Sequence, residues 1–105
     1  ERQNFIITGK FSAKLISRSY HSLLQHLAHC PASADIEALF RALLTEKEQQ
    51  EIANRIRIFD LLARGVTQRE ISEQLGVGIA TVSRGAKAMQ AHDVSALLAT
   101  HRENA

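Results

Sequence analysis

The sequence has few of the residues that mark secreted, membrane or disulfide-rich proteins. Its 105 residues include one cysteine, one proline and no tryptophan. The single cysteine, Cys30, cannot close a disulfide within the chain, which favours a reducing compartment. No apolar run approaches the roughly 20 residues that a membrane-spanning helix needs, and the N-terminus lacks the apolar stretch of a signal peptide. These absences predict a soluble, cytoplasmic protein without a membrane partner.

The chain is short and has little net charge. At 45% hydrophobic residues it fits one domain, and chains of this size often complete their core by dimerising. A net charge of +2 permits a polyanionic partner but does not require one, and no long block of like charges is present. Any contact with nucleic acid must therefore come from individually placed residues.

The apolar periodicity predicts an all-α fold of about six short helices. Residues 1–10 show no helical period and are predicted to be a flexible N-terminal arm, which leaves residues 11–105 as a single domain. A last helix is expected to follow Asp93, which can cap it through its carboxylate. The other predicted helices span residues 11–30, 35–44, 46 to about 64, 68–75 and 79 to about 91.

Capping signals locate two of these helices. Thr45 with Glu48, and Thr67 with Glu70, have the spacing of capping boxes, in which the hydroxyl and the carboxylate bind each other's free amides. Gly65 stands where the end of the third helix favours a left-handed residue. The third predicted helix has an apolar stripe that faces the core, and further apolar residues widen it. The stripe residues are Ile52, Ile56, Phe59 and Ala63, those that widen it are Ile58, Leu61 and Leu62, and the later residues predicted to face the core are Ile71, Leu75 and Val82.

Residues 68–88 have the pattern of a helix-turn-helix motif. A capped helix of about two turns precedes a short turn that starts at Gly76, where a positive φ lets the two helices cross sharply. Arg69 can form two hydrogen bonds with a guanine edge, and Ala80 and Thr81 offer methyl groups to thymine. An ordinary corner between two helices is the alternative. The residues predicted to contact DNA are Gln68, Arg69, Ser72, Gly78, Ile79, Ala80, Thr81, Ser83 and Lys87.

The segment QREISEQLGVGIATVSRG at 68–85 resembles the tryptophan operon repressor family. Leu44-Thr45 and the segment NRIRI at 54–58 add to the resemblance, which runs from about Tyr20 to Gln90. It implies an intertwined homodimer that binds double-stranded operator DNA, takes L-tryptophan as its corepressor and needs no other cofactor. It also implies that tryptophan represses the genes of its own biosynthesis through this protein.

The same resemblance implies a ligand site. Arg55 and Arg84 would hold the indole between their side chains, and Arg84 and Thr45 would meet the carboxylate, since guanidinium groups both stack on rings and bind carboxylates. The carbonyls of Ala42 and Leu44 would accept the ammonium, because a helix C-terminus has free carbonyls. The implied ligand residues are Ala42, Leu44, Thr45, Arg55, Arg84, Gly85 and Ala88.

Some positions depart from the family pattern and keep other functions open. Ala88 stands where the best-known members have a hydroxyl, and Ser72 replaces a basic residue. A helix-turn-helix regulator that responds to a different ligand, or to none, is therefore the first alternative. A dimeric interaction module without DNA binding is the second, and Arg69 and Thr81, both predicted to be exposed, argue against it.

No pattern indicates a metal site or an enzyme. His26 and His29 are neighbours on the first predicted helix, but His21 and Cys30 project elsewhere, and a zinc site needs converging ligands. The sequence contains no serine nucleophile flanked by glycines, as hydrolases have, and no pair of carboxylates spaced for acid–base catalysis. The sequence therefore predicts a protein without catalytic activity.

Overall fold

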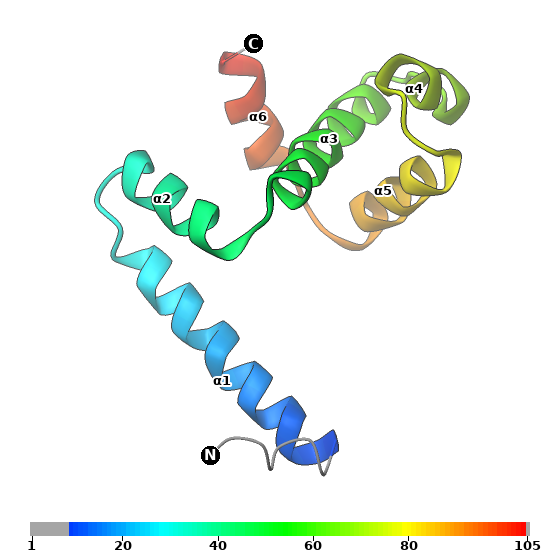
Figure 1. Cartoon of the computed structure of the whole chain (residues 1–105). Coiled ribbons are helices and arrows are strands. Elements are labelled where there is room, and N and C mark those ends of the chain that lie inside the picture. Colours follow the sequence, from blue (N-terminus) through cyan, green and yellow to red (C-terminus); the bar gives the residue numbers. More distant parts are fainter. Residues whose placement is uncertain (1–8, 105) are drawn as a thin grey trace. The chain divides into compact units, whose positions relative to one another are not determined.

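The computed structural model describes residues 9–104, with side chains from Ile16 onward, and the described residues are helical without any strand (Figure 1). This confirms the all-α prediction. None of the helices in this part of the chain is both long and apolar enough to cross a membrane. The helices are α1 Gly9–Ala28, α2 Ser33–Leu43, α3 Glu46–Ala63, α4 Gln68–Leu75, α5 Ile79–Ala91 and α6 Ser95–Glu103.

The ends of the helices correct two details. Most of the predicted N-terminal arm lies outside the described residues, but Gly9 and Lys10 already belong to α1. The apolar stripe starts later than the helix because the first turn of a helix needs no apolar residue. The N-cap of α6 is Val94, whose side chain makes no capping hydrogen bond, and not Asp93. Asp93 precedes the N-cap by one residue, and its Oδ1 accepts a hydrogen bond from the Ser95 amide at 2.9 Å.

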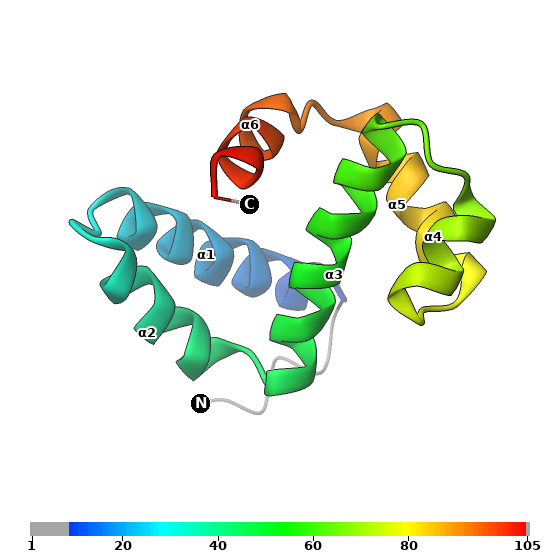
Figure 2. The ribbon, with the colours of Figure 1, turned by 90° about the horizontal axis from the view of Figure 1, so that it is seen from above.

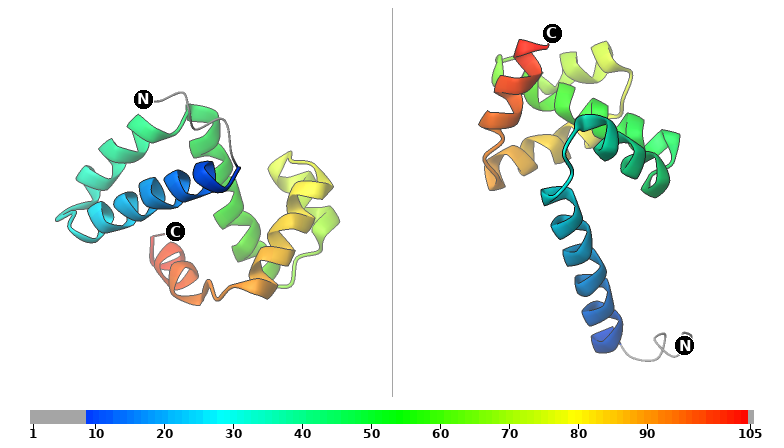
Figure 3. Two further views of the ribbon diagram at one scale, coloured as in Figure 1. Left: turned by 90° about the horizontal axis from the view of Figure 1, so that it is seen from below. Right: turned by 90° about the vertical axis from the view of Figure 1, so that its left-hand side faces the viewer.

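The chain divides into two compact units, Glu1–Leu43 and Leu44–Ala105, called the N-terminal and C-terminal units below. In the N-terminal unit a short turn joins α1 to α2 (Figure 3). None of its described side chains, from Ile16 to Leu43, is buried, and Ile16 and Tyr20 are 68% and 62% exposed. These two helices therefore have little core of their own.

The core of the C-terminal unit forms around α3. The helices α4 and α5 lie side by side on one flank of α3, and α6 contacts α3 from another side (Figures 1 and 2). Ile58, Ile71 and Val82, one from each of α3, α4 and α5, are completely buried against one another. The helix-turn-helix segment is thus built onto α3 through a single shared core.

Two residues of the predicted core face lie outside this core. Ile52 is 44% exposed and Ala63 is also exposed, so their assignment to the core is wrong for the single chain. The reason is that α4 and α5 cover the side of α3 that contains Ile58, which the periodicity gave only as a widening of the stripe, and this cover does not reach Ile52 or Ala63. Phe59 is buried at 8% exposure.

The capping signals are confirmed. Thr45 Oγ1 accepts a hydrogen bond from the Glu48 amide at 3.1 Å, and the Thr45 amide donates to Glu48 Oε1 at 2.9 Å. Thr67 and Glu70 make the same reciprocal pair at the start of α4. Gly76 has the left-handed φ of 67° that the sharp crossing of α4 and α5 requires.

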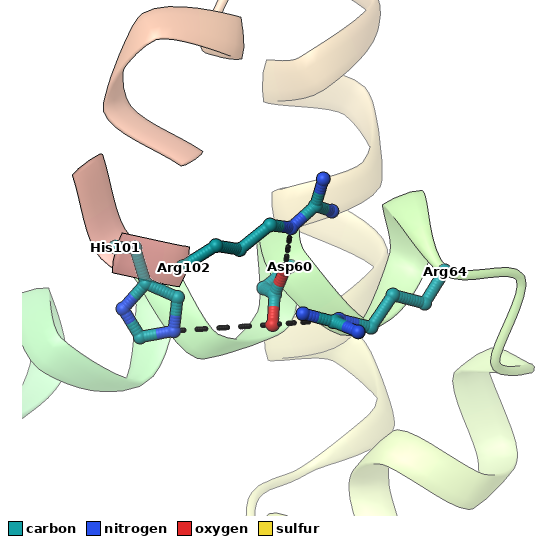
Figure 4. A network of polar contacts seen from close by, with 4 residues as sticks. All are labelled: Asp60, Arg64, His101 and Arg102. Carbon is teal, nitrogen blue, oxygen red and sulfur yellow. Dashed lines mark hydrogen bonds and ion pairs between the residues drawn. The ribbon is translucent and has the colours of Figure 1, made fainter. Parts of the chain in front are cut away.

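A buried carboxylate fastens α6 to α3 (Figure 4). Asp60, whose side chain is 12% exposed, accepts hydrogen bonds from Arg102 Nε at 2.8 Å and from Arg64 Nε at 3.0 Å. His101 Nε2 lies 3.9 Å from the same carboxylate. The hydrogen bond from Arg102, followed by the bond and charge of Arg64, holds the pKa of Asp60 below its ordinary value of 3.8 despite burial. Asp60 is therefore held as a charged group between the two helices.

Candidate DNA-contacting surface and ligand pocket

The turn between α4 and α5 is closed by its own hydrogen bonds. The amides of Gly76 and Val77 both donate to the carbonyl of Ser72, at 3.0 and 3.2 Å. The Ser72 hydroxyl donates in return to the carbonyl of Val77 at 2.6 Å. Ser72, predicted to contact DNA, is therefore half-buried and already uses its hydroxyl proton within the turn, so it cannot donate to a phosphate while the turn stays closed.

Most of the other predicted DNA-contacting residues lie at the surface of α4 and α5. Ile79 is 53% exposed at the first position of α5, and Gly78, its N-cap, provides no side-chain hydrogen bond to the helix. The side chain of Arg69 makes no hydrogen bond to any residue that the structure describes, so its guanidinium donors are available to a partner. Arg69, Gly78, Ile79, Ala80 and Lys87 are exposed, and Gln68, Thr81 and Ser83 are half-buried.

A glycine brings α5 close to α3. A Cβ atom at Gly85 would lie 2.7 Å from Ile58 Cγ2 and 3.8 Å from Arg55 Cδ. Carbon atoms in contact normally stand about 3.5–4.0 Å apart, so only a glycine allows this approach. Gly85 is buried and therefore acts through helix packing, which also places the stem of Arg55 beside α5.

Arg55 and Arg84 border one pocket between α3 and the start of α5. Its volume is about 400 Å³, and its other lining residues are Glu51, Asn54, Val77, Gly78 and Thr81. Arg84 Nη2 donates a hydrogen bond to Thr81 Oγ1 at 3.3 Å. The structure thus brings together the two arginines of the implied ligand site, with Gly85 packed behind Arg55.

Comparison with known proteins assigns the chain to a family. The family model described as Trp repressor protein matches residues 18–101, which includes the pocket and the helix-turn-helix segment. The chain belongs to the Trp repressor family. This confirms the resemblance found in the sequence.

Curated relatives within the Trp repressor family are moderately similar to the chain. The Trp operon repressor homolog of Xylella fastidiosa (strain M23) is 29% identical over 82 residues, which cover 77% of this chain and 89% of that protein. The homolog of Aliivibrio fischeri (strain MJ11) is 34% identical over 67 residues, or 63% of this chain and 62% of the relative. No solved structure gives a significant match. The chain is thus a regulator of the Trp repressor type.

The remaining ligand residues implied by the Trp repressor family do not border this pocket. Ala42 belongs to the N-terminal unit, and Ala88 is half-buried farther along α5. Thr45 accepts the capping hydrogen bond from Glu48, and the carbonyl of Leu44 accepts a long bond of 3.4 Å from Gln49 Nε2. The pocket within one C-terminal unit is therefore formed by only part of the implied set.

Three pocket residues were not predicted from the sequence, namely Glu51, Asn54 and Val77. Glu51 stands four residues before Arg55, a helical spacing that places the two side chains on one face of α3 and could have identified it. Val77 follows the turn glycine, and its place in the pocket depends on how the turn packs against α3. Among the described residues, no group of three or more histidine, cysteine or acidic side chains is arranged to hold a metal ion.

Proposed function

We propose that the protein is a tryptophan-dependent transcriptional repressor that acts in the cytoplasm on operator DNA of tryptophan biosynthesis genes. The observation that supports this proposal is that the pocket and the predicted DNA-contacting surface have two residues in common. Gly78 and Thr81 border the pocket of Arg55 and Arg84, and they also belong to the predicted DNA-contacting set at the start of α5. A ligand in the pocket therefore touches the helix that would enter the DNA groove.

Tryptophan suits the chemistry of this pocket. The planar guanidinium groups of Arg55 and Arg84 can cover the two faces of an indole ring, and Arg84 can also bind a carboxylate. In the proposed complex, Thr45 meets the carboxylate as well, and the carbonyls of Ala42 and Leu44 accept the ammonium. Repression then needs no catalytic step, because a ligand that binds the DNA-competent arrangement more tightly shifts the population towards it.

DNA binding is proposed through α4 and α5. Arg69 is the base-reading residue, because its guanidinium is exposed and can form two hydrogen bonds with guanine. Ala80 and Thr81 offer methyl contact to thymine, with the exposed Ile79 beside them at the start of α5, and Lys87 meets a phosphate. The free amides at the start of α5 add to phosphate binding, since no side chain caps that helix.

A homodimer explains the exposed apolar residues of both units. None of the described side chains of α1 and α2 is buried. The large apolar side chains of Tyr20 and Leu24, for example, are 62% and 46% exposed. In the C-terminal unit, Ile52 and Leu97 are 44% and 42% exposed and border a mostly apolar groove of about 460 Å³. We propose that a second copy covers these faces. A compact, folded monomer in sedimentation at micromolar concentration would contradict the dimer.

A DNA mobility-shift experiment with and without L-tryptophan tests the function. Tryptophan should strengthen binding to operator duplex much more than binding to a random duplex of equal length. Equal binding in both conditions would favour a constitutive regulator, and a response to another small molecule would favour a differently gated one. No binding to any duplex by the folded dimer would favour the interaction module and overturn the proposal.

A further inference from the structure

The helix α6 has one face that is turned towards α3. On this face Leu98 is buried, at 5% exposure, and Arg102 Nε donates to Asp60 Oδ1 of α3 at 2.8 Å (Figure 4). Leu98 and Arg102 stand four residues apart, so they lie one above the other along the helix. One apolar and one ionic anchor therefore fix the rotation of α6 on α3.

This rotation decides where Leu97 lies. Leu97 precedes Leu98 by one residue, which turns its side chain about 100° around the helix. There it borders the apolar groove of about 460 Å³ that Ile52, Ile56 and Phe59 of α3 also line. Among the described lining residues, Leu97 alone belongs to α6, and the others are Leu44 and residues of α3. The groove therefore has a side that exists only while α6 is docked in this rotation.

The helix α6 has little else to hold it in place. It is nine residues long, and its N-cap Val94 provides no side-chain hydrogen bond. Isolated helices shorter than about 12–15 residues are marginal in water, so α6 depends on its contacts with the rest of the unit. A partly buried ion pair adds little net stability, but it favours one arrangement, because any other leaves a charge without its partner. The pair of Asp60 and Arg102 is suited to this role, since it joins two helices.

Resting on the proposed dimer, we infer that Arg102 is a positioning residue for dimerisation, because its ion pair with Asp60 holds Leu97 in the groove that a second copy covers. A second copy is the occupant because α1 and α2 of the same chain have apolar faces without a core, so two copies can cover each other's apolar surfaces. Both copies must then have α6 docked. A fall of the docked fraction to about one third in each copy would weaken the dimer about tenfold.

The test measures the dimer dissociation constant of whole-chain variants. Fluorescence-detected sedimentation, with a dye on the N-terminal amine, follows dissociation from picomolar to micromolar protein. The variants are Arg102→Gln, Arg102→Lys, Leu97→Ala and the double variant of Arg102→Gln with Leu97→Ala. The matched control is Arg64→Gln, because Arg64 is the C-cap of α3 and bonds the same carboxylate at 3.0 Å without joining two helices. Circular dichroism checks that each variant is folded.

The inference predicts that the two arginines of Asp60 differ. Arg102→Gln should raise the dissociation constant about tenfold, and Arg102→Lys should raise it less because lysine keeps the charge. Leu97→Ala should also weaken the dimer, and Arg102→Gln should add at most about twofold in that background, because its effect acts through Leu97. Arg64→Gln should leave the constant within about twofold of the unchanged chain, because its bond lies at the end of one helix.

Three results would overturn the inference while the dimer stands. Arg102→Gln could dissociate like the unchanged chain, Arg64→Gln could weaken the dimer as much as Arg102→Gln, or the losses of Arg102→Gln and Leu97→Ala could simply add. If the unchanged, folded chain sediments as a monomer at every concentration, the proposed dimer itself fails and the inference fails with it. Should Arg102→Gln lose its helical signal, Arg102→Lys, alone and with Leu97→Ala, takes its place in the same comparison.

Discussion

Replacing Gly85 by alanine should force α5 away from α3. The added Cβ would lie 2.7 Å from Ile58 Cγ2, against an ordinary carbon contact of about 3.5–4.0 Å. Ile58 is 0% exposed and packed among Ile71 and Val82, so it cannot turn into solvent to make room. One of the two helices must therefore shift by about 1 Å to restore normal contact.

The expected cost follows from two opposing terms. Overpacking a well-packed core costs about 1–3 kcal/mol, whereas alanine in place of glycine inside a helix returns up to about 1 kcal/mol. We expect Gly85→Ala to lower the free energy of unfolding by about 1–2 kcal/mol, the net of these two terms. A shifted α5 also moves Arg84, so the variant should bind L-tryptophan more weakly.

Urea unfolding at one fixed protein concentration measures this cost, and two further variants make the measurement specific. Ile58→Leu removes the branch methyl that Gly85→Ala would meet, so the cost of Gly85→Ala should shrink by about 1 kcal/mol in that background. Gly78→Ala is the control, because its Cβ would have nothing within 4 Å; whatever it costs as a poorer N-cap of α5 should stay the same in the Ile58→Leu background. A Gly85→Ala protein as stable as the parent, or no relief by Ile58→Leu, would refute the reasoning.

Further predictions concern the buried carboxylate, the ligand and the DNA. Because hydrogen bonds from two arginines hold the pKa of Asp60 below 3.8, its contribution to stability is present above that value and is lost as the pH falls through the lowered pKa. Asp60→Asn should therefore cost about 1–3 kcal/mol at neutral pH and flatten acid unfolding below pH 4, whereas parallel acid curves would contradict this. Arg84→Ala should nearly abolish L-tryptophan binding, measured by the fluorescence of the ligand. Arg55→Lys should weaken this binding less, because lysine keeps the positive charge and loses only the planar group that stacks on the indole. Equal losses in the two variants would argue against stacking. Arg69→Ala should cost about 1–3 kcal/mol on operator DNA and relax the preference at one base pair, whereas Lys87→Ala should weaken operator and random duplex alike, in shift assays across salt concentrations.

The features that could be predicted from the sequence are those set by neighbouring residues. The capping pair of Thr67 with Glu70 depends on a spacing of three residues, and the left-handed turn at Gly76 depends on the residue itself. Both are local and were predicted correctly. For the same reason, the predicted bounds of α4 agree with the structure.

The features that could not be predicted depend on contacts between distant segments. Asp60 and Arg102 are 42 residues apart, and nothing near either residue indicates that α6 brings them together. The place of Val77 in the pocket likewise depends on how the turn lies against α3. Apolar periodicity shows that a face of α3 is apolar, but the position of α4 and α5 decides that Ile58 is covered and Ile52 is not.

The closed turn between α4 and α5 has a consequence for changing which DNA site such a protein prefers. The groups that hold the motif in shape are the buried Ile71 and Val82, backbone atoms, and the hydrogen-bonding side chains of Ser72, Thr67 and Glu70. Arg69 and Ile79, the proposed reading residues, contribute no side-chain hydrogen bond to that framework among the described residues. Arg69 and Ile79 thus lie outside the framework that Ser72 helps to build, so these two outer positions can be exchanged for those of another operator preference while the folding unit is kept.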